Sequence, residues 1–313
     1  MVVVSRRYQR MERDLNPDYE FLIGVDGGGT GTRACIARAD GVELARGSSG
    51  PSALMHGSAP AWAAVLAAVQ HAFGEAGLAL PALDRIAIGL GMAGVHNKQW
   101  AADFAANNPG FGMMALATDA FTTLLGAHQG QPGAIVAIGT GSVGEALLAD
   151  GTRREVGGWG FPSSDEAGGA WLGMRAINHA QRVLDGRAAT GEFARAVIGR
   201  CCGDRDGVFA WLAGAGQGAY AQLAPLVIEH APADQAARDI MVLAGQEIAQ
   251  IAAALDPTSR LPIALCGGLA APVRGYLPEP LAARVVMPTA DAVGGALQLI
   301  RRRLEQEERE LRR

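Results

Sequence analysis

One pattern occurs twice in the chain, at positions 110 residues apart. In each copy an apolar run enters a turn of glycine and hydroxyl residues, a second run follows, and an Asp-Gly pair then predicts a tight hairpin. The turn is Gly29–Thr32 in the first copy and Gly139–Ser142 in the second, and the Asp-Gly pairs begin at Asp40 and Asp150. An internal repeat of this kind limits the fold to one built from related units. It predicts two similar domains, each opening with a β-hairpin that carries a glycine turn.

Strands and helices alternate in both halves of the chain, which predicts an α/β fold. The first half has predicted strands at 21–26, 33–39, 42–46, 85–90 and 112–118, and predicted helices at 59–77 and 120–129. The second half has predicted strands at 134–142, 143–149, 152–156 and 261–266, and predicted helices at 167–184, 234–255 and 291–304. We expect domains at 21–128 and 129–300, a loosely held leader at 1–20 and a charged helical tail at 301–313.

Composition excludes several classes of protein. The net charge is −4, so no basic excess indicates binding to nucleic acid or to an anionic membrane. No apolar run reaches the roughly 18 residues that a membrane helix needs. The four cysteines form no CxxC pair and the six histidines show no metal-ligand spacing. These features favour a reduced, cytoplasmic protein without a structural zinc site.

The two glycine turns are candidate phosphate-binding sites. Backbone N–H groups in such turns form a concave surface for anions, and two hydroxyl residues in each turn add donors. The hydroxyl residues are Thr30, Thr32, Thr140 and Ser142. The alternative is that both are plain hairpin turns whose glycines need a positive φ. The GxxxxGK[ST] pattern of a Walker loop is absent from the chain.

Two aspartates stand where predicted strands end. Asp26 precedes the first glycine turn, where a carboxylate could hold Mg²⁺ directly or through water. Asp119 follows the strand at 112–118 and could accept the proton of an attacking hydroxyl group, as aspartates do in phosphoryl transfer. For Asp119 the alternative role is the N-cap of the helix that follows.

A glycine-rich loop at 157–169 combines an aromatic ring with carboxylates. Trp159 offers an apolar face, and Asp165 and Glu166 offer acceptors for hydroxyl groups, which together suit a sugar. The alternative is a loop whose aspartate caps the next helix. Later in the chain, Gly267–Gly268 ends a strand, where a flat ring such as adenine could lie against the backbone.

Taken together, these residues resemble the sugar-kinase/Hsp70/actin superfamily, and more narrowly its group of N-acetylglucosamine kinases and BadF/BadG-type ATPases. The resemblance covers almost all of the chain from Phe21 to Ile300. Its specific motifs are Gly24–Thr30, Thr118–Ala120, Gly139–Ser142 and Val156–Gly160. The stretch 118–169 is especially similar to bacterial glucosamine kinases.

The resemblance implies two RNase H-like (actin-like ATPase) domains around a nucleotide cleft, with ATP and Mg²⁺ as cofactors. It implies that Asp119 is the catalytic base and that the carboxylate of Asp26 binds the metal. The residues assigned to ATP are Gly27, Gly28, Gly29, Thr30, Thr32, Gly139, Thr140, Gly141, Ser142, Gly267 and Gly268. The residues assigned to the sugar are Gly94, Asp119, Thr140, Gly158, Trp159 and Asp165.

The expected activity is ATP-dependent phosphorylation of an amino sugar, glucosamine or N-acetylglucosamine, at the 6-hydroxyl group by a cytoplasmic homodimer. The family commonly has a sugar-binding asparagine after a turn like Gly50–Ser52, whereas this chain has Ala53 and Leu54, so the type of hexosamine stays open. One alternative is a BadF/BcrA-type ATPase that couples hydrolysis to a partner protein. A sugar sensor without catalysis and a nicotinamide dehydrogenase are further alternatives. The retention of Asp26 and Asp119 argues against the sensor.

Overall fold

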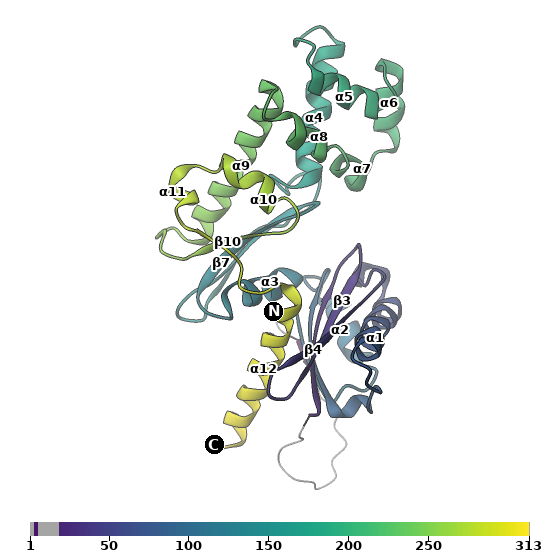
Figure 1. Ribbon diagram of the computed structural model, residues 1–313, viewed down its shortest axis with the longest axis vertical. Coiled ribbons are helices and arrows are strands. Elements are labelled where there is room, and N and C mark those ends of the chain that lie inside the picture. The colour runs from purple at the N-terminus through teal and green to yellow at the C-terminus, as the bar shows by residue number, and fades with distance from the viewer. Residues whose placement is uncertain (1–2, 6–18, 313) are drawn as a thin grey trace. The chain divides into compact units, whose positions relative to one another are not determined.

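The fold consists of two units, each built on one β-sheet (Figure 1). This computed structural model describes residues 3–5 and 19–312. Unit 1 comprises Met1–Gln131 and Pro288–Arg313, and unit 2 comprises Pro132–Met287. No helix in the described part of the chain is long and apolar enough to cross a membrane.

Unit 1 holds a six-stranded mixed sheet in the order β1-β6-β5-β2-β3-β4. Its strands are β1 (Val3–Ser5), β2 (Phe21–Gly27), β3 (Thr32–Arg38), β4 (Glu43–Ser49), β5 (Ile86–Met92) and β6 (Met113–Ala117). Its helices are α1 (Ser58–Glu75), α2 (Lys98–Ala106), α3 (Asp119–His128) and α12 (Ala292–Leu311), with 3₁₀ turns η1 (Leu54–His56) and η2 (Leu83–Arg85). Strand β2 pairs with β3 in antiparallel fashion and with β5 in parallel fashion, so the hairpin and the parallel strands share one sheet.

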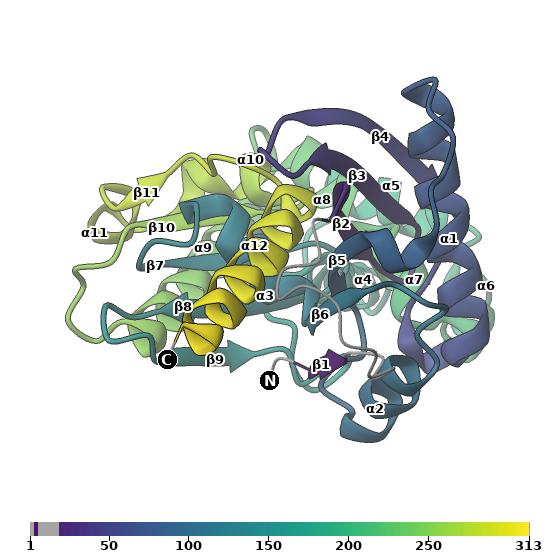
Figure 2. The ribbon, with the colours of Figure 1, turned by 90° about the horizontal axis from the view of Figure 1, so that it is seen from below.

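Helices cover both faces of this sheet, with α1 on one face and α12 on the other (Figure 2). The alternation of side chains along β2 explains this arrangement. Ile23 and Val25 are buried in the core that contains the apolar side chains of α1. Gly24 faces α12, and an added Cβ atom there would collide with the carbonyl oxygen of Val293. Glycine is therefore needed for α12 to approach β2 closely.

Unit 2 holds a five-stranded sheet in the order β11-β10-β7-β8-β9. Its strands are β7 (Gly133–Ile138), β8 (Ser142–Leu147), β9 (Arg153–Gly157), β10 (Ile263–Cys266) and β11 (Val285–Val286). Its helices are α4 (Gly169–Leu184), α5 (Glu192–Arg200), α6 (Arg205–Gly214), α7 (Gln217–Ala221), α8 (Ala224–His230), α9 (Gln235–Leu255), α10 (Ala270–Val273) and α11 (Glu279–Ala282), with a 3₁₀ turn η3 (Arg274–Tyr276). Helix α9 packs on β7, β8 and β9, and α4 contacts α5, α7, α8 and α9.

The α/β prediction and the internal repeat are confirmed. Strands β2, β3 and β4 correspond to β7, β8 and β9, and each triplet is an antiparallel meander whose first strand also has a parallel neighbour. The expected secondary structure misses helix α2 and the helices α5–α8, which fill the stretch between α4 and α9.

The domain boundaries differ from the expected ones at both ends of the chain. Helix α12, expected partly in the second domain and partly in a tail, is one continuous helix that belongs to unit 1. Its close contacts with β2, β5 and α3 decide this, and no local sequence pattern could reveal them. In the expected leader, Val3–Ser5 forms strand β1, antiparallel to β6. Residues 6–18 lie outside the described part of the chain.

Candidate active site

The predicted site residues lie where parallel strands end in each unit. In unit 1, Gly27 is level with Met92 across β2 and β5, and Gly91 is level with Ala117 across β5 and β6. The first glycine turn, Gly94 and Asp119 follow these strand ends directly. In unit 2, β7 and β10 run parallel and end before the second glycine turn and Gly267. Loops at the carboxyl ends of parallel strands are the usual place for ligand sites in α/β folds.

The first glycine turn is closed by a hydrogen bond from the Gly28 N–H to the Gly31 oxygen at 3.0 Å. The fold requires glycine at Gly27, because an added Cβ would collide with the Ser52 hydroxyl and lie 2.6 Å from the Met92 sulfur. At Gly29 an added Cβ would meet no atom within 4 Å. Packing therefore explains the first glycine of the turn and leaves Gly29 open to an approaching ligand.

The second glycine turn has the same construction. The Gly139 N–H donates to the Gly141 oxygen at 2.9 Å, and Gly139 has open space where a Cβ would lie. At Gly141 an added Cβ would collide with the carboxylate of Asp165. The first amides of α4 bind this turn, since Gly169 donates to the Gly139 oxygen at 2.8 Å and Ala170 to the Thr140 oxygen at 2.9 Å.

The two turns connect antiparallel strands, but their backbone conformation does not supply the reason for glycine that the plain-hairpin alternative gave. Among the described residues, the glycines of both turns are absent from those with a positive φ. The Asp-Gly hairpins behave differently, because Gly41 and Gly151 have φ values of +96° and +83°. Neither left-handed geometry nor lack of space therefore accounts for glycine at Gly29 and Gly139.

The hydroxyl residues of the turns divide into two kinds. Thr32 is buried and is bonded within the fold, since its hydroxyl donates to the Gly50 oxygen at 2.7 Å and forms a second hydrogen bond, also 2.7 Å long, with the Ser52 hydroxyl. Ser142 is also buried and donates to the Glu166 oxygen at 2.6 Å. Thr30 and Thr140 are exposed, and their hydroxyl groups bond to no residue that the structure describes. Thus the first hydroxyl of each turn is available to a ligand, whereas Thr32 and Ser142 hold their turns in place.

Asp119 is the first residue of α3, and its carboxylate is not the helix cap. The cap is Thr118, whose hydroxyl accepts from the Phe121 N–H at 3.1 Å. One carboxylate oxygen of Asp119 accepts from the Ala120 N–H at 3.0 Å. Burial raises the pKa of Asp119, nearby Asp26 raises it further, and His96 lowers it. A half-buried carboxylate with a raised pKa at a strand end suits a general base.

Asp26 forms an ion pair with Arg33, its neighbour across the hairpin, at 2.5 Å. No cluster of three or more potential metal ligands exists among the described residues. Two carboxylates, Asp26 and Asp119, nevertheless lie close enough to affect each other electrostatically. Mg²⁺ usually takes one or two protein carboxylates and fills its other positions with water and phosphate oxygens. These residues therefore fit a Mg²⁺ ion that binds together with a nucleotide, in competition with Arg33 for Asp26.

Asp165 is buried, and its carboxylate packs against the second turn instead of capping helix α4. The N-cap of α4 is Gly168, and no side chain caps it. The Asp165 carboxylate accepts from the Gln217 side-chain amide at 3.1 Å and from the backbone of Ser142, while burial raises its pKa. Its φ of +67° is unusual for a residue other than glycine and marks local strain, which is frequent at functional sites.

The loop between β9 and Asp165 presents Trp159 to solvent, with 86% of the residue's surface exposed. Its neighbour Gly158 has a φ of +71°, which only glycine adopts easily. In unit 1, Gly94 has a φ of +95° and packs against Leu54 and Trp100. An aromatic ring left this exposed has an unused apolar face, which is the property that a sugar-binding aromatic needs.

The fold has no room for a side chain at Gly267 but leaves open space at Gly268. Gly267 has a φ of +90°, and an added Cβ would collide with the Ile138 oxygen. Gly268 has open space instead. The chain turns back here, because the Leu269 N–H donates to the Ile138 oxygen at 3.1 Å. Close packing accounts for Gly267, and only Gly268 is open to a flat ring.

Three residues near these groups were not identified from the sequence. Ser52 joins the end of β4 to the first turn, because its N–H donates to the Gly28 oxygen at 3.0 Å. His96 lies close enough to Asp119 to influence its pKa. Gln217 reaches Asp165 from 52 positions away along the chain. The Gly-Pro-Ser turn was a usable signal for Ser52, but no local pattern indicates Gln217.

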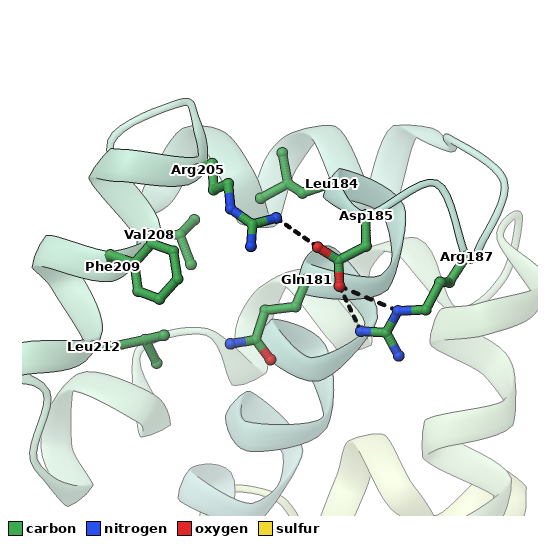
Figure 3. A pocket seen from close by; sticks show the side chains of 8 residues that line it. All are labelled: Gln181, Leu184, Asp185, Arg187, Arg205, Val208, Phe209 and Leu212. Carbon is green, nitrogen blue, oxygen red and sulfur yellow. Dashed lines mark hydrogen bonds and ion pairs between the residues drawn. The ribbon is translucent and has the colours of Figure 1, made fainter.

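A separate cavity of about 260 Å³ lies between α4 and α6 in unit 2 (Figure 3). None of the predicted site residues lines it. Its charged groups satisfy one another, since the Asp185 carboxylate binds Arg205 at 2.6 Å and Arg187 at 2.7 Å. This cavity is therefore distinct from the candidate active site.

Comparison with known proteins identifies a matching family and proteins that are similar to this chain along most of its length. Residues 23–296 match the model of the BadF/BadG/BcrA/BcrD ATPase family. The chain is 33% identical over 279 residues to "Glucosamine kinase GspK" of Vibrio cholerae, covering 88% of this chain and 94% of that protein. A crystal structure from Chromobacterium violaceum, named "Putative N-acetylglucosamine Kinase", is 50% identical with a TM-score of 0.87, covering 91% of this chain and all of that one.

A more distant structure supports the fold alone. A ROK family glucokinase from Streptomyces griseus, solved with glucose and AMPPNP, has a TM-score of 0.53 at 19% identity, covering 90% of this chain and 99% of that one. The predicted two-domain fold of the actin-like ATPase type is confirmed by these similarities.

The four cysteines, all in the described part of the chain, are unpaired.

Proposed function

The chain belongs to the BadF/BadG/BcrA/BcrD ATPase family, and from that premise we propose that it is an ATP-dependent amino-sugar kinase. Its substrate is glucosamine or N-acetylglucosamine, and the acceptor is the 6-hydroxyl group. The observation that carries the proposal is the repeated turn in which Gly29 and Gly139 are open and lack a positive φ. Glycines without a packing or conformational reason are expected where backbone amides approach phosphate groups.

In the proposed reaction, the sugar hydroxyl oxygen attacks the terminal phosphorus of ATP. A new O–P bond forms, the bond between this phosphorus and the bridging oxygen breaks, and ADP leaves with the bonding electron pair. Asp119 accepts the hydroxyl proton, and its raised pKa makes it a stronger base than an ordinary aspartate. The proton passes to water when the sugar phosphate departs.

Both glycine turns supply the electrostatic part of catalysis in this proposal. Their backbone amides, with the hydroxyl groups of Thr30 and Thr140, bind phosphate oxygens and stabilise the charge that spreads over them during transfer. The N-terminus of α4 adds a favourable dipole behind the second turn. A bound Mg²⁺ ion near Asp26 supplies further positive charge.

We assign sugar recognition to the residues that the sequence indicated, namely the loop at 157–169, Gly94 and Asp119. The exposed ring of Trp159 covers the CH face of the sugar, and Asp165 accepts from its hydroxyl groups. Ala53 and Leu54 are buried and apolar, so they supply no hydrogen bond to an N-acetyl group. We further propose that the enzyme works as a homodimer in the cytoplasm, where ATP is available.

A panel of acceptors tests this proposal against the coupled-ATPase alternative, which the family match also supports. ADP release is measured with glucosamine, N-acetylglucosamine, N-acetylmannosamine, glucose and no sugar. The kinase proposal requires turnover that depends on an amino sugar and a phosphorylated product in equal amount. Turnover that is the same with and without sugar would favour the ATPase.

A further inference from the structure

Unit 2 has another cavity, of about 280 Å³, between α4 and α9. Its lining residues are Arg175, Asn178, His179, Arg182, Ala236, Asp239, Ile240 and Leu243. Arg175, His179 and Arg182 are spaced four and three residues apart, so one face of α4 carries all three. The lining contains two arginines and the carboxylate of Asp239, while the carboxylates of Glu247 and Asp234 act on Arg175 and His179 from outside the lining.

Arg175 is held firmly, but it has no ion-paired or hydrogen-bonded acceptor among the residues that the structure describes. Its guanidinium carbon lies 3.9 Å from the centroid of the Trp171 ring, and Trp171 is buried. Its Nε–H is buried and has no hydrogen-bond partner. Burial lowers the pKa of Arg175, and attraction to Glu247 only partly offsets this effect. A half-buried cation without a bonded acceptor costs free energy, and a bound anion would recover it.

The other charged groups of this cavity also leave an arginine without an ion-pair partner. Arg182 makes no ion pair with any residue that the structure describes. Asp239 accepts from the Gln235 side chain at 2.6 Å, on its own helix. The cavity between α4 and α6 is a useful contrast, because there Asp185 binds both arginines (Figure 3). In the α4–α9 cavity, by contrast, neither arginine forms an ion pair with a residue that the structure describes.

We propose that the α4–α9 cavity is a binding site for the phosphate or carboxylate group of a small molecule. Arg175 and Arg182 provide charged donors, and Asn178 provides an amide. His179 lies against Phe193, with ring centroids 5.7 Å apart, and forms one wall. The volume of about 280 Å³ leaves room for an organic part beside the anionic group. None of the residues assigned to ATP or to the sugar lines this cavity, so the inference does not depend on the proposed function.

Calorimetric titration with inorganic phosphate tests this site in the full-length chain. The variants are Arg175→Met and Arg182→Gln, and the control is Arg200→Gln, which removes an exposed arginine of α5 away from the cavity. Removing one charged donor should weaken the phosphate binding of this cavity about tenfold. Binding to the glycine turns is common to all four proteins, so differences among them report on the cavity.

The expected result is saturable binding that each cavity variant weakens about tenfold and the control keeps. Arg182 is exposed, so Arg182→Gln folds even if Arg175→Met does not. As a local readout, the Nε–H NMR signal of Arg175, identified by its absence in Arg175→Met, should shift as phosphate is added. Equal phosphate binding by the wild type and Arg182→Gln, or an Nε–H signal that phosphate leaves unchanged, overturns the proposal.

Discussion

Replacing Gly29 by alanine separates a turn that binds phosphate from a turn that only connects two strands. The added Cβ would meet no atom within 4 Å, and φ at this position is not positive. The fold therefore accepts alanine without strain. The free energy of unfolding should stay constant or rise by about 0.4–1 kcal/mol, because alanine restricts the unfolded chain more than glycine does.

The effect of Gly29→Ala on the KM for ATP should be large compared with its effect on stability. In the proposed function the methyl group of Gly29→Ala would occupy the space through which a phosphate oxygen reaches the backbone amides. Loss of one hydrogen bond to a charged group costs about 1.5–3 kcal/mol. At about 1.4 kcal/mol per tenfold, the KM for ATP should rise roughly 10- to 150-fold. The KM for the sugar should change little, because the sugar is assigned to other residues.

The assay is ADP release at varied ATP and saturating sugar, combined with thermal denaturation of the same preparation. The matched control is Gly74→Ala in α1, where the added Cβ also has open space but no ligand is assigned. That variant should keep the wild-type KM. If Gly29→Ala keeps both the wild-type KM for ATP and the wild-type stability, the phosphate assignment of the first turn is wrong.

Four further predictions concern three other residues. Asp119→Asn should lower kcat by about 10²- to 10⁴-fold while ATP still binds, as measured by turnover and nucleotide titration. Full turnover by this variant would show that Asp119 is not the general base. Because the pKa of Asp119 is raised in the fold, its ionisation lowers stability as pH rises from the ordinary aspartate pKa up to the raised one, so Asp119→Asn should gain melting temperature relative to wild type at pH 7 but not at pH 3.5. Gln217→Ala should raise the KM for the sugar roughly tenfold by freeing Asp165, whereas an effect on the KM for ATP alone would contradict this role. Gly295→Ala would collide with the Thr122 oxygen and should destabilise unit 1 by about 1–3 kcal/mol in denaturant unfolding, and unchanged stability would refute the packing argument.

Local sequence patterns predicted the repeated hairpins and most strands correctly. The apolar runs around Gly29 and Gly139 became β2 and β7, and the Asp-Gly pairs became turns with positive φ at Gly41 and Gly151. Such features depend on neighbours a few positions apart, so a single sequence reveals them. The position of Asp119 at a strand end is of the same kind.

Packing between distant segments decided the remaining features. The sequence divided α12 between the second domain and a tail, but contacts at Gly24 and Gly295 bring it into unit 1. It suggested a capping role for Asp119, which Thr118 fills in the structure. It treated Thr32 and Thr30 alike, although only the Thr32 hydroxyl is consumed inside the fold.

The sequence by itself therefore determined the two-unit plan, the strand–turn–strand units and the chemical types of the site residues, because these follow from periodicity and from the side chains present. The tertiary structure alone decided which of those side chains stay available to a ligand. Availability depends on partners such as Ser52 and Gln217, which reach the site through hydrogen bonds between segments that are far apart along the chain.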